Sequence, residues 1–383
     1  MSAKTNLTES AAATSHSTAT ATSKAAATST ATATSTAPSI ATAQDIALAA
    51  QVLDEGGLVA FPTETVYGLG ADASSPEAVA RIYAAKGRPS SHPVIVHVAP
   101  DADLSFWAAK VPDEAKALIR AFWPGPLTLI LKRSTHTPSS VSGGQDSVGL
   151  RCPSHPVAQA LLRAFADRRG GHAGVAGPSA NRFGHVSPTQ AVHVKKEFPD
   201  LVAQGMPVLD GGPSEVGIES TIVDLSRLDQ GMGPVLLRPG QITADQLSEV
   251  LGLPVLPPDL SAPRVSGALK SHYAPKTPLK LVARAELLQM ASHPERVMSP
   301  AELSSAKKIA VVSHSLSHPP AEMDSRILWS GMPNDPIEYG HVLYTRLRLL
   351  DESGADLIAW EDVPKTQAWA GIWDRLSRAA AAH

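Results

Sequence analysis

The sequence contains a single cysteine, Cys152, among its 383 residues. One thiol excludes an internal disulfide and any zinc or iron–sulfur site built from several cysteines, and it suits a reducing compartment. The chain also lacks an excess of either charge, because 33 Lys and Arg stand against 36 Asp and Glu. The formal net charge of −3 therefore provides no global attraction to nucleic acid or to an anionic membrane.

Long apolar runs and aromatic side chains are scarce as well. No stretch approaches the ~18 consecutive apolar residues of a transmembrane helix, so we expect no membrane contact. Aromatic residues make up only 4% of the chain, which leaves few rings for stacking on nucleic-acid bases. These absences favour a soluble cytoplasmic protein in which any anion-binding site is a local cluster of cations.

The first forty residues differ from the rest of the chain. They contain 12 Ala, 11 Thr and 8 Ser and almost no large apolar side chain, so residues 1–40 are predicted to be a disordered tail. The tail has no apolar segment typical of a secretory signal and no arginine. Cytoplasmic location is the prediction, and mitochondrial targeting by this Ser- and Thr-rich tail is the alternative.

Apolar periodicity from residue 41 onward alternates between helical and strand spacing. It predicts helices at 43–54, 76–85, 112–121, 156–167 and 244–251, and strands at 58–61, 94–98, 127–131, 148–152, 174–176, 208–209, 221–225 and 235–237. We therefore predict an α/β domain over 41–252, with one sheet of mixed or mostly parallel strands covered by helices.

Residues 253–278 are rich in Pro and Ser and predict a linker. A second α/β pattern follows over 279–383. It predicts strands at 279–283, 308–312 and 356–359, and helices at 340–352 and 369–381.

Several common catalytic motifs are missing or incomplete. The chain has no P-loop, and Gly68-Leu69-Gly70 is followed at 72–76 by a predicted turn where a dinucleotide-binding helix would have to begin. Residues 177–181 resemble a nucleophile elbow without its second glycine, and the chain contains no zinc-binding H-E-x-x-H motif. These gaps argue against a nicotinamide-dependent enzyme, a serine hydrolase and a zinc enzyme.

Polar residues gather instead at the predicted ends of strands, where an open α/β sheet builds its ligand crevice. Thr63, Glu64 and Thr65 follow the strand at 58–61 and suit either a small zwitterion or an ordinary turn. Ser220 and Arg238 add a hydroxyl and a cation beside two further strands.

Two cations close the helix at 76–85. Lys86 and Arg88, followed by Pro89, suit phosphoryl oxygens, although helix C-termini also attract cations without any ligand. In the next cluster, the two-residue period places Ser147, Gly149 and Arg151 on one face of a strand. A strand arginine requires an anion, which is either a ligand or the partner in an internal salt bridge.

The loop at 177–189 supplies Ser179, Asn181 and Ser187 together with backbone N–H groups. Such a donor-rich loop can bind phosphates without a P-loop, and the alternative is an ordinary loop with no ligand. The four cations of these clusters indicate an ATP-using transferase, provided that they converge on one cavity. They are Lys86, Arg88, Arg151 and Arg238.

In this order, the clusters resemble the threonylcarbamoyl-AMP synthase family. The resemblance rests on P-T-E-T-V-Y-G-L-G at 62–70, K-x-R-P at 86–89, G-L-R-x-P at 149–153, S-x-N and S-P-T within 179–189, E-S-T at 219–221 and L-R-P-G at 237–240. Residues 266–275 resemble the family's linker, and 279–383 the C-terminal domain of its two-domain members. The fold implied is a YrdC-type twisted mixed sheet with covering helices, plus a smaller Rossmann-like α/β domain.

The resemblance implies that L-threonine, bicarbonate and ATP, bound with Mg2+, become threonylcarbamoyl-adenylate and pyrophosphate. A separate tRNA threonylcarbamoyl transferase would use the product, and direct RNA binding stays open. The resemblance assigns threonine binding to Thr65, His97, Arg151, Gly177 and Ser220. It assigns ATP binding to Arg88, His92, Ser147, Ser179, Asn181, Ser187, Arg238 and Tyr273. From the spacing of Lys86 and Arg88 beside Pro89, we predict that these two cations are catalytic and neutralise the charge that develops between the α-phosphate and the departing pyrophosphate.

Two positions depart from the family pattern: His92 replaces an Asn, and Ser147 stands where Thr is commoner. Tyr273, in the polar linker, is expected to close over the nucleotide and to exclude water from a labile mixed anhydride. The competing interpretations are an RNA-binding module and an enzyme that makes a carbamoyl-adenylate from another substrate.

Overall fold

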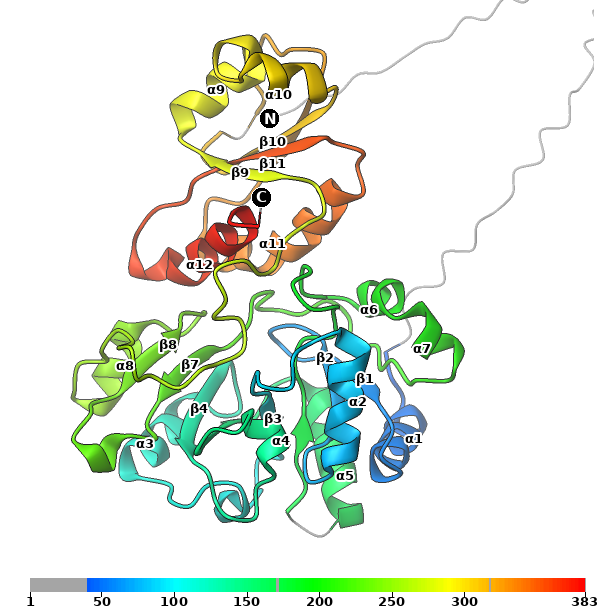
Figure 1. The fold of residues 1–383 in the computed structure, drawn as a ribbon, viewed down its shortest axis with the longest axis vertical. Coiled ribbons are helices and arrows are strands. Elements are labelled where there is room, and N and C mark those ends of the chain that lie inside the picture. Colours follow the sequence, from blue (N-terminus) through cyan, green and yellow to red (C-terminus); the bar gives the residue numbers. More distant parts are fainter. Residues whose placement is uncertain (1–39, 170–171, 317, 383) are drawn as a thin grey trace, which may run out of the picture. The chain divides into compact units, whose positions relative to one another are not determined.

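The computed structural model describes residues 40–169, 172–316 and 318–382. Apart from residue 40, the tail predicted to be disordered lies outside these residues, as does any targeting signal within it. The described chain forms an eight-stranded and a four-stranded sheet (Figure 1). None of the helices in this part of the chain is long and apolar enough to cross a membrane.

The larger sheet has the strand order β1-β2-β6-β3-β5-β4-β7-β8. Its strands are β1 (Val59–Phe61), β2 (Gly68–Asp72), β3 (Ile95–His97), β4 (Leu127–Lys132), β5 (Ser147–Arg151), β6 (Val175–Ala176), β7 (Thr221–Asp224) and β8 (Val235–Arg238). Only the pairs β3–β5 and β4–β7 are parallel. The prediction of a mixed sheet is confirmed, and its mostly parallel variant is wrong because the successive strands β1–β2, β4–β5 and β7–β8 turn back on each other.

Helices surround this sheet. They are α1 (Ala43–Asp54), α2 (Pro76–Lys86), α3 (Asp113–Phe122), α4 (Ser139–Ser142), α5 (Pro156–Arg169), α6 (Ala191–Glu197), α7 (Pro199–Ala203) and α8 (Ala244–Leu251), with 3-10 turns at η1 (Leu104–Phe106) and η2 (Leu228–Gln230). Ser75 caps the start of α2, and Gly87 ends it with a left-handed φ of 62°. The helix therefore stops at Gly87 rather than at Pro89, because glycine adopts this conformation without steric cost.

Strand β2 is missing from the predicted elements. Its sequence, Gly68 to Asp72, contains two glycines and an alanine, residues with low β-propensity. Pairing with β1 on one side and β6 on the other nevertheless makes it a strand. The predicted strand at 208–209 is reduced to an isolated bridge between Val208 and Ala60.

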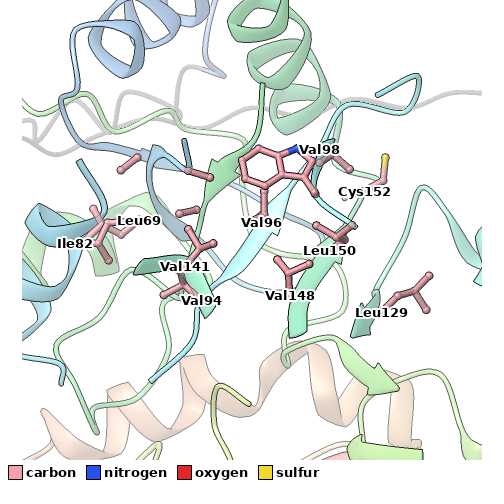
Figure 2. Packing of buried hydrophobic residues seen from close by; sticks show 14 of the residues in the cluster. Leu69, Ile82, Val94, Val96, Val98, Leu129, Val141, Val148, Leu150 and Cys152 are labelled. Carbon is pink, nitrogen blue, oxygen red and sulfur yellow. The ribbon is translucent and has the colours of Figure 1, made fainter. Parts of the chain in front are cut away.

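The alternation predicted for β5 is confirmed. Val148 and Leu150, with Cys152 just beyond the strand, lie in the main apolar core (Figure 2). Ser147 and Arg151 lie on the opposite face and line cavities. The two-residue period of the strand thus separates the core from the site.

The smaller sheet is entirely parallel, in the order β11-β10-β12-β9. Its elements are β9 (Leu279–Val282), α9 (Arg284–Ser292), η3 (Pro294–Arg296), α10 (Pro300–Ser305), β10 (Ile309–Ser313), β11 (Ile327–Gly331), α11 (Pro336–Asp351), β12 (Leu357–Glu361), η4 (Gln367–Trp369) and α12 (Ala370–Ala380). This is the second, Rossmann-like α/β domain that the sequence implies, although β11, α9 and α10 were not among the predicted elements.

The core beneath α11 and α12 includes residues from both sequence halves. Val66, Ile218 and Tyr273 belong to the same buried cluster as Leu343 and Tyr344 of α11. The chain segments around the predicted site therefore pack on the C-terminal helices as well as on their own sheet.

Candidate active site

A small polar pocket gathers most of the predicted site residues. It is lined by Thr65, Val66, Ile95, His97, Arg151, Gly177, Pro178, Ser179, Glu219, Ser220, Arg238, Ser266, His272 and Tyr273. These residues come from the ends of β3, β5 and β8, the start of β7, the loops after β1 and β6, and the linker. The prediction of an ATP-using transferase required four cations to converge on one cavity. Two of the four, Arg151 and Arg238, line this pocket.

One side of the pocket carries hydroxyl and imidazole groups. Thr65 is fully buried, in a turn held by the Thr63 hydroxyl, which donates to the carbonyl of Val66 at 2.6 Å. His97 is buried, and its Nδ1 lacks a hydrogen-bond partner among the described residues. A Cβ on Gly177 would lie 2.8 Å from that Nδ1, so only glycine fits here. The Gly177 N–H already donates to the Ile95 carbonyl, which leaves its own carbonyl for any ligand contact.

Arg151 forms an internal ion pair. Its guanidinium lies 2.7 Å from Oε1 of Glu64, and both side chains are only 4% exposed. Glu64 also accepts a hydrogen bond from the N–H of Ser154. The salt-bridge alternative is thus realised, yet Arg151 still lines the pocket beside His97, its register partner on β3. Sequence reasoning had placed Glu64 in the right cluster without identifying Arg151 as its partner.

Arg238, at the end of β8, lines the same pocket and is 3% exposed. Its guanidinium donates to the carbonyl of Ser220 (3.0 Å), to the Ser220 hydroxyl (3.1 Å) and to the carbonyl of Ser266 (2.9 Å). All three acceptors are neutral. Among the described residues, Arg238 forms no ion pair with a carboxylate, so its charge is available to an anionic ligand.

The two remaining cations are buried just behind this pocket. Arg88 donates to the carbonyl of Pro93 and, at 3.3 Å, to the hydroxyl of Ser266, the residue that also binds Arg238. Lys86 donates to the carbonyls of Ser179 and Asn181, and therefore anchors the loop after β6. Burial, with a smaller contribution from nearby Arg88, lowers the pKa of Lys86 well below its ordinary value.

Five of the eight predicted ATP ligands lie outside the pocket lining: Arg88, described above, and His92, Ser147, Asn181 and Ser187. The Asn181 side chain donates to the carbonyls of Arg182 and His185, and its Oδ1 lacks a partner among the described residues. The Ser187 hydroxyl donates to Glu219 at 2.5 Å. His92 packs its ring edge-on against Phe183, 5.5 Å between centroids. Ser147 lines a second small cavity that shares Ile95 and Ser266 with the first.

The linker fills the space that a nucleotide would need. Ser266, His272 and Tyr273 line a cavity of only about 30 Å³, whereas sites for small ligands usually measure roughly 300–1,000 Å³. Ser266 occupies the guanidinium donors of Arg88 and Arg238. This conformation is therefore closed, and a ligand of nucleotide size would fit only if the linker moved.

No metal-binding cluster of three or more His, Cys, Asp or Glu occurs within the described residues. A larger cavity of about 550 Å³ lies between the end of α3 and the starts of α11 and α12. Its lining contains none of the residues predicted for the site.

Sequence reasoning missed the contacts of Glu219 with the C-terminal helices. This pocket-lining carboxylate accepts hydrogen bonds from Tyr344 of α11 and Arg375 of α12, both at 2.8 Å. Burial raises its pKa, but Arg375, Arg238 and the Ser187 hydroxyl outweigh that effect and lower the pKa to about 2. An arginine within a predicted amphipathic helix carries no sequence signal for such a role.

The buried histidines predict a pH dependence of stability. Burial lowers the pKa of both His97 and His272 to about 3, whereas each ionises near 6.5 in the unfolded chain. Below that value the unfolded state binds more protons, so the free energy of unfolding should fall by about 2 to 3 kcal/mol per pH unit. Urea denaturation between pH 6.5 and 5.0 measures this slope. The double variant His97→Asn/His272→Gln should make it shallower without abolishing it, because burial also lowers the pKa of His193 to about 4, and an equally steep slope in that variant would contradict the assignment.

Comparison with known proteins identifies two matching families. A family model described as telomere recombination matches residues 51–240, and one described as threonylcarbamoyl-AMP synthase, C-terminal domain, matches residues 242–381. Threonylcarbamoyl-AMP synthase of Pyrococcus abyssi is 35% identical over 344 residues, covering 87% of this chain and 93% of the relative. The enzyme of that name from Bacillus subtilis is 38% identical over 340 residues, covering 87% and 92%. The solved structure of P. abyssi Sua5 complexed with L-threonine is similar with a TM-score of 0.75 at 33% identity, over 88% of this chain and 95% of that one.

Proposed function

The chain belongs to the threonylcarbamoyl-AMP synthase family, and from that premise we propose that it converts L-threonine, bicarbonate and ATP into threonylcarbamoyl-AMP and pyrophosphate. The observation that carries the proposal is the meeting of Thr65, Arg151 and Arg238 in one buried pocket. A hydroxyl and a cation suit the polar groups of an amino acid, and a second, carboxylate-free arginine suits a polyphosphate.

The threonine half of the site is assigned to the hydroxyl-bearing side. Arg151 would bind the substrate carboxylate while Glu64 holds its guanidinium in place. Thr65, Ser220 and the Gly177 carbonyl would contact the remaining polar groups, and neutral His97 would face the amine. Burial lowers the pKa of His97 to about 3, so this imidazole can accept a hydrogen bond at neutral pH.

The nucleotide half is assigned to the side of Arg238. Arg88 and Arg238 would exchange Ser266 for phosphoryl oxygens when the linker opens. Lys86 would hold the loop that bears Ser179 and Asn181 and would add charge behind it. Ser147 and Ser187 would contribute hydroxyls, and the placement of His92 against Phe183 makes it the weakest of the assigned ligands.

The chemistry requires charge neutralisation and positioning rather than a covalent nucleophile. The threonine amine loses a proton and adds to CO2 derived from bicarbonate, which forms a carbamate. A carbamate oxygen then attacks the α-phosphorus of Mg2+-bound ATP as the bond to pyrophosphate breaks. Buried cations stabilise the charge that spreads over the phosphoryl oxygens.

The product would serve a separate transferase that places the threonylcarbamoyl group on tRNA, and we propose the cytoplasm as the place of action. The burial of the four cations, each no more than 7% exposed, argues against the alternative of an RNA-binding module. A nucleic-acid backbone requires exposed cations.

The function is tested by incubating the protein with ATP, bicarbonate and each amino acid in turn, followed by mass analysis of the adenylates. Threonine should yield a carbamoylated adenylate, and omission of bicarbonate should abolish it. A preferred product from another amino acid would favour the alternative of a carbamoyl-adenylate synthase with a different substrate.

The linker tyrosine should protect the product. Tyr273 is 1% exposed and packs against His272 and Tyr344. Tyr273→Ala should admit water to the mixed anhydride, so that AMP appears at the expense of threonylcarbamoyl-AMP. The Tyr273 hydroxyl lacks a partner among the described residues, and Tyr273→Phe is therefore the matched control with wild-type products. Chromatography of the nucleotides measures the ratio, and an unchanged ratio in Tyr273→Ala would count against a closing linker.

A further inference from the structure

Glu219 is a buried carboxylate at the edge of the proposed nucleotide site. It lines the pocket, is 6% exposed and directly precedes Ser220, whose carbonyl and hydroxyl bind Arg238. Its carboxylate accepts hydrogen bonds from Ser187 on Oε1 and from Tyr344 and Arg375 on Oε2. Of these three donors, only Arg375 carries a charge.

Arg375 comes from the C-terminal domain. It lies in α12, is fully buried and reaches Oε2 of Glu219 at 2.8 Å. The same guanidinium donates to the carbonyls of Glu219 (3.2 Å) and Pro239 (2.7 Å). These carbonyls flank Ser220 and Arg238, so one side chain of the C-terminal domain holds the two segments that carry the nucleotide side of the pocket.

The surrounding charges are balanced only when Arg375 is present. Asp374 pairs with Arg375 at 2.9 Å and with Arg378 at 2.8 Å. Together with Glu219, these residues contribute two negative and two positive charges. Removal of the Arg375 charge would leave a net negative charge inside the protein, beside the pocket.

A buried carboxylate without a counter-ion is strongly unfavourable and draws the nearest cation toward it. Arg238 is the cation in position to respond, because it lines the same pocket as Glu219 and is bonded to Ser220, the next residue in the chain. Within the described part of the chain, Arg238 is bonded only to neutral oxygens. A direct pair with Glu219 would consume the charge that the phosphates require.

We propose that Arg375 is a positioning residue that neutralises Glu219 and thereby keeps Arg238 available for the polyphosphate of ATP. The proposal rests on the proposed function, because it takes ATP as the ligand of Arg238. It assigns the C-terminal domain a part in the active site, as the source of the counter-ion. Tyr344, a neutral donor to the same carboxylate oxygen, cannot supply this charge.

The test is the dissociation constant for ATP, measured by titration calorimetry on the full chain. Arg375→Met should raise it by at least about tenfold. The double variant Glu219→Gln/Arg375→Met removes both charges and should bring it back to within about threefold of wild type. Arg375→Lys retains the charge and should also stay within about threefold. Arg346→Met is the matched control, since Arg346 of α11 donates to the Ser330 hydroxyl within the C-terminal domain, does not line the pocket, and should not alter ATP binding.

The outcomes separate the two proposals. Unchanged binding by Arg375→Met, or a double variant as weak as the single one, would overturn the role of Arg375 while the proposed function stands. If circular dichroism shows that Arg375→Met is unfolded, the double variant Glu219→Gln/Arg375→Met decides the question. ATP binding by this double variant that is tenfold weaker than wild type would also overturn the proposal. Failure of the wild-type chain to bind ATP would remove the proposed function and the role of Arg375 together.

Discussion

Arg88→Ala should lower the rate of pyrophosphate release by about 10² to 10³. The guanidinium is 7% exposed and lies next to Ser266, the same linker residue that binds Arg238. A cation in so dry a site stabilises developing phosphoryl charge far more than an exposed one does. Continuous detection of pyrophosphate at saturating threonine and bicarbonate measures the rate. Arg81→Ala, on helix α2 just before Arg88 in the sequence and exposed to solvent, should retain the wild-type rate.

Lys86 provides the companion measurement. Lys86→Met removes the ammonium that holds the carbonyls of Ser179 and Asn181, so both the rate and the stability of the variant should fall. The rate is therefore compared per folded molecule, with unfolding followed by circular dichroism. Near-wild-type pyrophosphate release by folded Lys86→Met and folded Arg88→Ala would refute the proposed charge neutralisation.

Arg151→Met should raise the KM for threonine by about 100-fold or more, with a much smaller change in the KM for ATP. The guanidinium lines the pocket and is the cation proposed for the threonine carboxylate, and loss of a charged hydrogen bond to a carboxylate is costly in a buried site. The variant also leaves Glu64 buried without its 2.7 Å partner, so its stability should fall as well.

A double variant separates substrate binding from the internal ion pair. Arg151→Met/Glu64→Gln removes both charges and should recover much of the lost stability, whereas the KM for threonine should stay high. Arg163→Met, at an exposed position on α5, is the control for an arginine replacement. A threonine KM restored by the double variant would mean that Arg151 serves only the ion pair with Glu64.

Most helices and strands of the larger sheet could be predicted because each leaves a local pattern. The helical spacing of residues 43–54 matches α1, and the alternation around 148–152 correctly places Arg151 opposite the core. Strand β2 could not be predicted, since its glycines gain strand geometry only from β1 and β6. The mainly antiparallel pairing of the larger sheet could not be predicted from the sequence either, because the relative direction of two strands depends on how the segment between them folds back in space.

The sequence by itself determined which side chains are candidates for the chemistry: Thr65, the cations at 86, 88, 151 and 238, and the linker with Tyr273 are all readable from short motifs. Tertiary structure alone decided how these groups are paired. Arg151 meets Glu64, Ser266 spans Arg88 and Arg238, and Glu219 meets Arg375 across 156 positions of sequence. Local periodicity specifies which face of an element is apolar, whereas a buried charge finds its partner only when distant segments pack together and water is excluded between them.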